Sequence, residues 1–341
     1  MTSLEQARCW FVRSGIQEAN GGVARFYRSD EAQNAKVSNE ITGYAASALV
    51  FVGDLDAARR AAAYLRDRAW NESSNTFSFE PDSPLAYFFD LGIIARGLLA
   101  VWRATGDDSF RELARHAALS LAFDFLGDGV FHPVIELPEK RPLGYEPRWS
   151  RSPGCYQLKA ALAWREIGDE QASRLFESAL EQSLRSHEGF LAAQTDREKL
   201  MDRLHAYCYF LEGLLGAADR EDVQAVLAGG IERVASLLRE IAPHFERSDV
   251  CAQLLRVRLI AHHLCSLALD EGAAAEEVRR TASYQSFDSD PRLRGGFWFG
   301  KKDGAILPFM NPVSTAFATQ ALTLWEQHRS GCWRLTLDQL I

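Results

Sequence analysis

The amino-acid sequence predicts an all-α fold of about twelve helices paired into six hairpins. First, apolar residues recur at helical spacing through most of the 341 residues, whereas the apolar–polar alternation typical of strands is nearly absent. Second, short turns rich in glycine and aspartate separate the helical stretches in pairs. Third, an internal repeat recurs along the chain, and such a repeat indicates one supersecondary unit per copy.

Each copy of the repeat ends one helix with a small residue and a leucine, turns at glycine and aspartate, and enters a second helix. Four complete copies and a fifth, incomplete one begin at Ala48, Gly97, Ala161, Gly213 and Ala321. A degenerate copy around residues 256–259 fills the double gap before the last start. Six hairpins can close into a ring in which one helix of each pair lines the centre and the other packs outside.

The helices follow from this pattern in chain order, each bounded by glycine, proline or polar turn residues. They are expected at about Ser3–Gln17, Asn39–Val52, Ala57–Trp70, Leu85–Ala104, Ser109–Phe125, Cys155–Ile167, Glu170–Ser186, Met201–Ala218, Asp222–Ile241, Asp249–Leu269, Ala273–Tyr284 and Val313–His328. Stretches such as 41–52 and 89–102 are apolar and rich in small residues, which is typical of helices covered on most sides. Stretches such as 57–70 and 220–240 carry one charged face and are expected outside.

Three connecting segments stand out. Residues 76–80 (TFSFE) indicate a short strand. The segment Gly127–Pro153 is long and rich in proline and glycine, and its aromatic residues favour an ordered, functional loop. The stretch Asp290–Trp325 begins as a loop of glycine, arginine and aromatic residues and continues into a buried helix, with Asn311 as the expected N-cap and Pro312 as the first helical residue.

Composition restricts the partners and the compartment. The net charge of −8 and the absence of a lysine or arginine tract argue against nucleic acid as the main partner. The six cysteines form no CxxC motif, and most lie in apolar helical stretches, so buried free thiols are expected. The N-terminus has no leader pattern and no run approaches about 18 apolar residues, so a cytoplasmic protein without a membrane span is expected. A single domain over residues 1–341 is expected, and the oligomeric state is left open.

With these features the chain resembles the (α/α)6 toroids, the six-hairpin architecture of many glycosidases, polysaccharide lyases and sugar epimerases. Three segments are similar to toroid proteins found with polysaccharide-biosynthesis genes: SNEITGYAASAL (38–49), DRLHAYCYFLEGLL (202–215) and GGFWFG (295–300). Terpenoid cyclases and lanthionine synthetases share related rings, so the fold alone does not give the reaction. The glycine-rich zinc motifs of the lanthionine enzymes are missing around Cys155, Cys208 and Cys332, and Asp288 and Asp290 only echo the DxDD motif of one cyclase class.

In such a ring the loops that enter the inner helices surround a central pocket, so functional residues are expected at the starts of those helices. Acids and a histidine at these starts are the candidate catalytic residues: Glu40, Asp90, Glu146 and His205. Aromatic, amide, hydroxyl and arginine side chains there are the candidate substrate-binding residues: Tyr44, Tyr145, Arg148, Tyr156, Arg203, Tyr207, Trp298, Asn311 and Thr315. Phe297, Trp298 and Phe299 are expected to form a rim, with Asn311 and Thr315 facing inward.

Several of these residues have a purely structural alternative. Glu40 fits a first-turn acid favoured by the helix dipole, and Asp90 fits a buried partner of an arginine. His205 fits a satisfied core histidine, and Arg203 two positions before it points about 200° away around the helix. Glu212 aligns with Arg96 in the repeat and is interpreted as structural.

No metal and no cofactor are expected. His262, His263 and Cys265 suggest a metal site only superficially, because adjacent histidines point to different sides of a helix. Gly295 and Gly296 follow no predicted strand and give no dinucleotide fingerprint.

The leading hypothesis is a protein that binds a sugar, a uronate or an oligosaccharide and acts on it as a glycoside hydrolase, lyase or epimerase. Hydrolysis needs two carboxyl groups, and Glu40, Asp90 and Glu146 are available. A lyase or epimerase would use His205, Tyr207 or Tyr145 as acid and base, with Arg148 or Arg203 neutralising a uronate carboxylate. The alternatives are a non-catalytic carbohydrate-binding or scaffold protein of a polysaccharide or glycosylation pathway, and a terpenoid-cyclase-like enzyme with an apolar ligand.

Overall fold

The computed structural model describes residues 2–192, 196–242 and 244–341. Twelve α-helices lie in this described part of the chain, together with thirteen strands of only two or three residues. The all-α fold class that the sequence predicts is therefore confirmed. No helix among the described residues is long and apolar enough to cross a lipid bilayer.

Internal contacts divide the chain into two compact units, each assembled from separate segments. Unit 1 consists of Met1–Ile16, Phe26–Ala35 and Glu188–Ile341. Unit 2 consists of Gln17–Arg25 and Lys36–His187. Each unit contains its own buried core, and the expectation of one domain over residues 1–341 stays a prediction.

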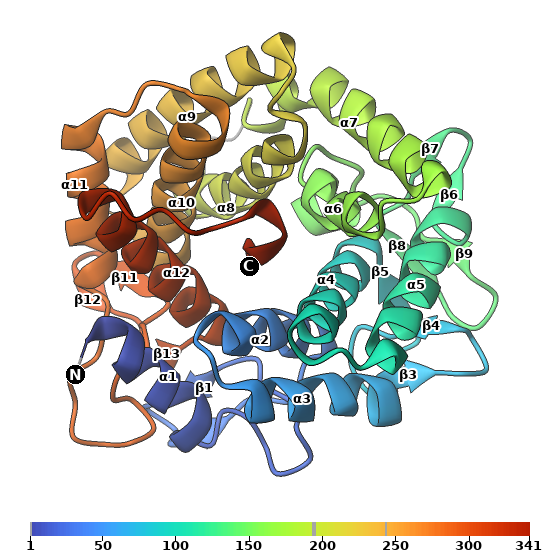
Figure 1. Cartoon of the computed structure of the whole chain (residues 1–341), viewed down its shortest axis with the longest axis horizontal. Helices are drawn as coiled ribbons and strands as arrows, with labels where there is room; N and C mark the ends of the chain where they lie inside the picture. Colours follow the sequence, from blue (N-terminus) through green and yellow to red (C-terminus); the bar gives the residue numbers. More distant parts are fainter. Residues whose placement is uncertain (1, 193–195, 243) are drawn as a thin grey trace. The chain divides into compact units, whose positions relative to one another are not determined.

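In unit 2, three helices form a row and three further helices cover it (Figure 1). The row contains α2 (Asn39–Phe51), α4 (Phe88–Thr105) and α6 (Gln157–Ile167), and the cover contains α3 (Leu55–Tyr64), α5 (Asp108–Phe123) and α7 (Glu170–Phe190). The central row helix α4 buries thirteen of its eighteen residues, whereas α3 buries only one face, made of four alanines and a tyrosine. The apolar and one-sided stretches of the sequence therefore became row and cover helices, as predicted.

Glycines let the row helices of unit 2 approach closely. A Cβ atom added at Gly97 of α4 would lie 2.4 Å from the main-chain oxygen of Gly43 in α2. A Cβ atom at Gly92, on the same helix, would lie 2.5 Å from both Cα and Cβ of Ala160 in α6. Because these neighbours are backbone atoms or a methyl group, they cannot move aside cheaply.

Replacing Gly92 by alanine is therefore expected to lower the free energy of unfolding by about 1–3 kcal/mol through overpacking. Gly229, in helix α9, is the matched control, because a Cβ atom there meets nothing within 4 Å. Gly229→Ala should raise stability by up to about 1 kcal/mol through helix propensity alone. Urea unfolding of both variants measures the two effects. Equal stabilisation by both substitutions would show that α4 and α6 can separate.

In unit 1, the row contains α8 (Arg197–Leu214), α10 (Ser248–Cys265) and α12 (Pro312–Arg329), and the cover contains α9 (Glu221–Ile241), α11 (Glu271–Ala282) and α1 (Ser3–Arg13). Helix α1 packs on α12, as Figure 1 shows. The indole nitrogen of Trp10 in α1 donates a hydrogen bond to the main-chain oxygen of Arg292, 2.8 Å away. The repeat copy that looks incomplete at Ala321 therefore has its second helix at the other end of the sequence.

Helix ends follow the expected capping chemistry at several places. Asn311 is the N-cap of α12, its side chain accepts hydrogen bonds from the amides of Val313 and Ser314, and Pro312 is the first helical residue. Helix α4 begins at Phe88 rather than Leu85, because residues 85–87 form a strand paired with residues 134–136. Tertiary pairing determined that boundary, and local propensity did not.

The strands pair into five small sheets that hold the loops between helices. In unit 2 these are β3 (Trp70–Asn71) with β4 (Thr76–Phe77), β5 (Leu85–Tyr87) with β8 (Val134–Glu136) and β9 (Arg141–Pro142), and β6 (Leu126–Gly127) with β7 (Val130–Phe131). In unit 1 they are β1 (Tyr27–Arg28) with β2 (Gln33–Asn34) and β13 (Phe309–Met310), and β10 (Phe245–Arg247) with β11 (Gly300–Lys302) and β12 (Ala305–Ile306). The strand predicted within residues 76–80 is present at 76–77. The other strands are too short to show a two-residue period in the sequence.

All six cysteines are free thiols. Cys155, Cys208, Cys251 and Cys265 are buried, as expected for cysteines in apolar helical stretches. Cys9 is partly exposed and Cys332 is exposed.

Candidate functional site

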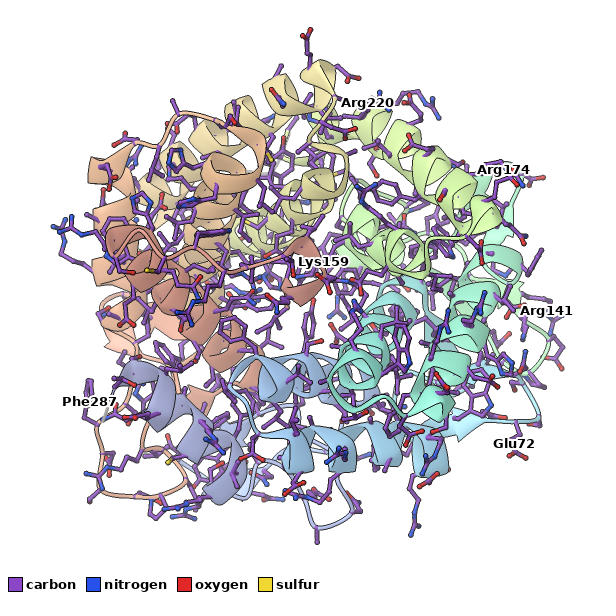
Figure 2. All side chains as sticks on the ribbon, in the orientation of Figure 1. Glu72, Arg141, Lys159, Arg174, Arg220 and Phe287 are labelled. Carbon is purple, nitrogen blue, oxygen red and sulfur yellow. The ribbon has the colours of Figure 1, made fainter. Side chains whose placement is uncertain are left out.

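A group of polar side chains, here called the carboxyl cluster, lies at the N-terminal ends of the row helices of unit 2. Its members are Glu40, Tyr44, Asp90, Tyr156 and Lys159. Glu40 and Tyr44 stand four residues apart on α2, and Tyr156 and Lys159 stand three apart at the start of α6, so each pair shares a helix face. The ammonium group of Lys159 lies 5.3 Å from the centre of the Tyr44 ring. Figure 2 labels Lys159 on the side of α6 that is turned away from α7.

Burial controls the protonation of the two carboxyl groups. It raises the pKa of Glu40 to about 7, although the positive charges of Arg25 and Lys159 oppose the shift. Burial also raises the pKa of Asp90 well above its usual value, and the negative charge of Glu40 raises it further. At neutral pH the two carboxyl groups therefore carry less than two negative charges between them, because ionising both is energetically costly.

Asp90 is enclosed but incompletely bonded. Its side chain is 7 % exposed, and its Oδ2 atom has no hydrogen-bond partner among the residues that the structure describes. The arginine deeper in the same helix, Arg96, pairs with Glu166 at 2.6 Å, and Arg25 pairs with Glu80 at 3.1 Å. Within the described residues Asp90 forms no ion pair with an arginine. The alternative interpretation of Asp90, as the buried partner of an arginine, therefore finds no support in these contacts. A buried carboxyl oxygen without a partner is costly unless a ligand satisfies it.

The shifted pKa of Glu40 predicts a pH-dependent loss of stability. The folded-state pKa of about 7 exceeds the ordinary value of 4.5, so the folded chain binds this proton more tightly than the unfolded chain does. The wild type should therefore lose stability as the pH rises through this interval. Glu40→Gln removes the titration and should raise the melting temperature by a few degrees at pH 8 while changing it little at pH 4.5.

Thermal melts between pH 4 and pH 8 measure the effect, and Glu139→Gln is the control because that side chain is 56 % exposed. A melting temperature of Glu40→Gln that falls relative to wild type as the pH rises would contradict the assigned burial penalty.

A second polar group, here called the His205 cluster, lies at the middle of α8 and the N-terminal end of α10 in unit 1. It consists of His205, Arg247, Asp249 and Gln253. The Nδ1 atom of His205 lies 2.7 Å from Oε1 of Gln253 and 3.6 Å from Oδ2 of Asp249. Because the amide oxygen of Gln253 accepts, Nδ1 of His205 carries the proton and Nε2 keeps its lone pair.

Burial, assisted by the charge of Arg247, keeps His205 neutral. Burial and the nearby charge of Arg247 lower the pKa of His205 to about 4. Burial alone would raise the pKa of Asp249, but the positive charge of Arg247 lowers it. Arg247 donates to both oxygens of Asp249, at 3.0 and 2.6 Å, and to Asp202 at 2.7 Å. This cluster thus combines an ionised, well-bonded carboxylate with a neutral imidazole.

The other predicted residues on α8 point elsewhere. Arg203 donates to the main-chain oxygen of Phe190 at 2.7 Å, and Tyr207 stacks on the Phe190 ring. Tyr207 also approaches Gly230 of the cover helix α9. Arg203 and His205 therefore diverge around the helix, as their spacing predicts. Arg203 and Tyr207 do not join the His205 cluster.

The predicted residues of the loop 127–153 are exposed. Tyr145 is 53 % exposed, and its hydroxyl group lies 2.9 Å from Nδ1 of His132. The Glu146 side chain is 57 % exposed and lies 3.8 Å from Arg151, and Arg148 is exposed as well. Glu146 thus lacks the enclosure that raises the pKa of Asp90, which makes it a weaker candidate for a proton donor.

The predicted residues near the last row helix bond mainly to the backbone. Asn311 caps α12, and the hydroxyl group of Thr315 accepts from the amide of Phe297 at 3.0 Å and donates to the main-chain oxygen of Asn311 at 2.9 Å. Phe297 is fully buried and cannot form part of a rim, because its backbone pairs with Gln285 and its ring lies in the core. Trp298 and Phe299 are partly exposed, and the Phe299 ring lies 4.7 Å from the guanidinium group of Arg247.

Two charged residues escaped sequence reasoning as site members. Lys159 is a single cation in the apolar stretch YQLKAALAW, and that isolation was the available signal. Arg247 lies in strand β10 just before α10, in a segment whose short strand gives no readable pattern. Their roles come from contacts across helices, which no spacing within one helix reveals.

The fold that carries these clusters is that of the (α/α)6 toroids, as the resemblance implied. No protein-family model matches the sequence, and no curated protein matches it. Among solved structures, the chain is similar to cellobiose 2-epimerase from Spirochaeta thermophila, with a TM-score of 0.71, 13 % identity, and coverage of 93 % of this chain and 94 % of that chain.

Two further solved structures are similar along almost their whole length. A D-mannose isomerase has a TM-score of 0.68 at 9 % identity, with coverage of 94 % of this chain and 96 % of that chain. A glycoside hydrolase family 76 mannosidase from Bacteroides thetaiotaomicron has a TM-score of 0.63 at 10 % identity, with coverage of 96 % and 99 %. At such identities the likeness establishes the fold alone.

Proposed function

We propose that the chain is a carbohydrate-active enzyme that hydrolyses a glycosidic bond with Glu40 and Asp90 as its proton-transferring pair. The observation that carries this proposal is the pair of interacting carboxyl groups whose pKa values burial raises. Glycoside hydrolysis needs one carboxyl group that is protonated near neutral pH and one that is ionised. The similarity in fold to a mannosidase and to sugar-converting enzymes supports a carbohydrate as the substrate.

The environments of the two carboxyl groups assign their roles. Burial and the charge of Glu40 raise the pKa of Asp90 and so favour its protonated form, which suits the general acid that donates its proton to the glycosidic oxygen as the C–O bond breaks. Glu40 lies close enough to Lys159 and Arg25 to feel both charges, so it is the group that ionises and accepts a proton from the attacking water. The water hydroxyl group is added to the sugar and the other fragment leaves as an alcohol. Tyr44 and Tyr156 are almost completely buried, at 2 % and 1 % exposure, so neither presents an open aromatic face to a sugar ring.

A hydrolysis screen tests this function. The purified chain is incubated with β-glucosides, α-mannosides and uronate-containing oligosaccharides, and new reducing ends are measured together with product NMR. The three segments similar to toroid proteins of polysaccharide biosynthesis favour a fragment of such a polymer among the substrates. New reducing ends that disappear in Asp90→Asn support the proposal. Sugar binding without any turnover would instead support a carbohydrate-binding or scaffold protein, and stabilisation by polyprenyl phosphates alone would indicate an apolar ligand.

A sugar epimerase or isomerase is the second candidate function, and the His205 cluster favours it. A neutral imidazole whose Nδ1 proton is committed to Gln253 presents Nε2 as a base, which such enzymes need beside a carbon next to a carbonyl group. The structurally similar cellobiose 2-epimerase and D-mannose isomerase are consistent with this candidate. Incubation of reducing sugars in deuterated water distinguishes the two. Incorporation of deuterium at the carbon beside the carbonyl group would support epimerisation or isomerisation instead of hydrolysis if it is lost in His205→Ala and retained in Asp90→Asn.

A further inference from the structure

Three histidines gather at the C-terminal ends of two row helices of unit 1. His262 and His263 belong to the last turn of α10, and His328 belongs to the last turn of α12. One ring nitrogen from each can be chosen such that all three lie within 4.8 Å of one another. The Nε2 atom of His263 and the Nδ1 atom of His328 are 3.0 Å apart. This three-histidine cluster lies about 20 Å along α10 from Asp249, so it is separate from the His205 cluster.

Hydrogen bonds orient two of the imidazoles toward a common point. The Nδ1 atom of His262 lies 2.8 Å from the main-chain oxygen of Leu267, which can only accept, so Nδ1 carries the proton and Nε2 is free to ligate. The Nε2 atom of His328 lies 2.8 Å from Oε1 of Glu271 in α11, so this nitrogen donates, and Nδ1 keeps a lone pair that faces Nε2 of His263 at 3.0 Å. A carboxylate and a main-chain carbonyl on the far ring nitrogens are the usual supports of metal-ligating histidines.

The third ring is held by stacking. The His263 imidazole lies 4.0 Å from the Trp333 ring, centre to centre, at an interplanar angle of 14°. The rings of His262 and His263 are 4.9 Å apart and meet at 72°. The expectation that adjacent histidines face different sides of the helix does not hold for the ring positions, because the rings of His262 and His263 both approach His328. The third ligand is His328, and Cys265 is not a member of the group that the structure brings together.

We propose that the three-histidine cluster binds a divalent transition-metal ion of the zinc type. The ligands are Nε2 of His262, Nε2 of His263 and Nδ1 of His328, and solvent supplies a fourth position because all three side chains are only partly buried. Tetrahedral zinc with ligand nitrogens at about 2.0–2.1 Å needs those nitrogens about 3.4 Å apart, which small side-chain shifts achieve from the present positions. Neutral imidazoles suit Zn²⁺ better than Mg²⁺ or Ca²⁺, which prefer oxygen ligands.

The site would connect the helices on which its residues lie. The ligands come from α10 and α12, and Glu271 of α11 supports one of them, so a bound ion ties the ends of three helices together. An ion that binds only the folded chain stabilises it by an amount that grows with the logarithm of its free concentration relative to its dissociation constant. The role is therefore structural and independent of the proposed glycoside hydrolysis.

Calorimetric titration of the EDTA-treated, dialysed full chain with ZnCl₂ tests the proposal. The expected result is saturable binding of one Zn²⁺ per chain and a higher melting temperature with Zn²⁺ than with EDTA. His328→Ala should weaken binding at least about tenfold, and Glu271→Gln, which leaves all three ligands, should weaken it about 10- to 100-fold. His116→Ala, at an exposed histidine of α5, is the matched control and should leave binding unchanged.

Two further measurements keep the test decisive. Melting curves in EDTA show whether each variant folds, and His328→Gln replaces His328→Ala if the latter does not. The absorption spectrum of the Co²⁺-loaded chain should lack a thiolate charge-transfer band, because no cysteine is a ligand. Absence of saturable binding, equal affinity of the His328 and His116 variants, or a thiolate band would overturn the proposal.

Discussion

Asp90→Asn is expected to reduce the turnover of a glycoside substrate by about 10²- to 10⁴-fold. Asparagine keeps the shape of the side chain but cannot donate a proton to the leaving oxygen. The loss should appear mainly in kcat, because the proton is transferred in the transition state rather than in the bound ground state. Glu40→Gln should reduce turnover by a similar factor, because the attacking water then has no base.

The pH dependence separates the two roles. The wild type should show a bell-shaped rate profile, whose alkaline side reports loss of the proton from the acid and whose acidic side reports protonation of the base. With a substrate whose leaving group needs no protonation, Asp90→Asn should recover activity and lose the alkaline fall. Glu40→Gln should not recover with that substrate. Because the two carboxyl groups interact, the two pKa values of the profile belong to the pair.

The control for this prediction is Asp56→Asn, which changes a carboxyl group in the first turn of α3 that is 87 % exposed. Its kcat should equal that of the wild type. Asp90→Asn should also melt at or above the wild-type temperature at neutral pH, because burial makes the ionised carboxylate costly in the folded chain. Full activity of folded Asp90→Asn would remove Asp90 from the mechanism, and a folded variant that melts far below wild type would identify Asp90 as a structural residue.

The sequence predicts the fold better than the site, and the reason lies in the range of the interactions. The helical hairpins depend on periodicity, glycine turns and caps such as Asn311, all of which are local. The pairing of α1 with α12 and the strand at residues 85–87 depend on contacts between distant segments. The local sequence pattern does not predict such contacts. Row and cover helices could be distinguished from the sequence because a helix buried on most sides is apolar all round, whereas a helix buried on one side keeps a charged face.

The candidate site shows the same limit. Glu40 and Asp90 were visible as acids in the first turns of apolar helices, and burial of those turns gives them their shifted pKa values. Glu146 has the same residue chemistry, but its loop is exposed, a property that depends on how residues 127–153 pack. The three-histidine cluster could not be found in sequence, because His328 stands 65 residues beyond His263.

Loss of the buried arginine of α10 should have the largest effect on stability: Arg256→Met is expected to reduce the free energy of unfolding by about 3–5 kcal/mol. Both Arg256 and its ion-pair partner Glu212 in α8 are fully buried. Arg256 also donates to Oε1 of Gln320 at 3.0 Å and to the main-chain oxygen of Ile341 at 3.2 Å, and its guanidinium group lies 3.9 Å from the Phe317 ring centre. Removing the cation leaves a buried carboxylate without its counter-charge.

Unit 2 contains an ion pair that corresponds to the pair of Arg256 and Glu212 in unit 1. Arg96 in α4 pairs with Glu166 in α6, and Glu212 in α8 pairs with Arg256 in α10, so each unit joins two neighbouring row helices through a buried ion pair. One member of each pair, Arg96 or Glu212, stands at the repeat-equivalent position. The signs are exchanged, since Glu212 occupies the place of Arg96. A buried ion pair can fix the relative register of two apolar helices, which is a specificity role attested for buried charges in some proteins.

Urea unfolding measures the effect, with Arg220→Met as the control. Arg220 pairs with Asp222 at 2.7 Å, but both side chains are substantially exposed, so this substitution should cost less than about 1 kcal/mol. The double variant Arg256→Met with Glu212→Leu should be more stable than Arg256→Met alone, because no charge then remains buried without a partner. If the double variant is instead the less stable, the cost of Arg256→Met comes from lost packing against Phe317 rather than from the unpaired carboxylate.

Because the charge of Glu212 raises the pKa of His205, the single and double variants should also differ in the titration of His205, which histidine NMR resolves.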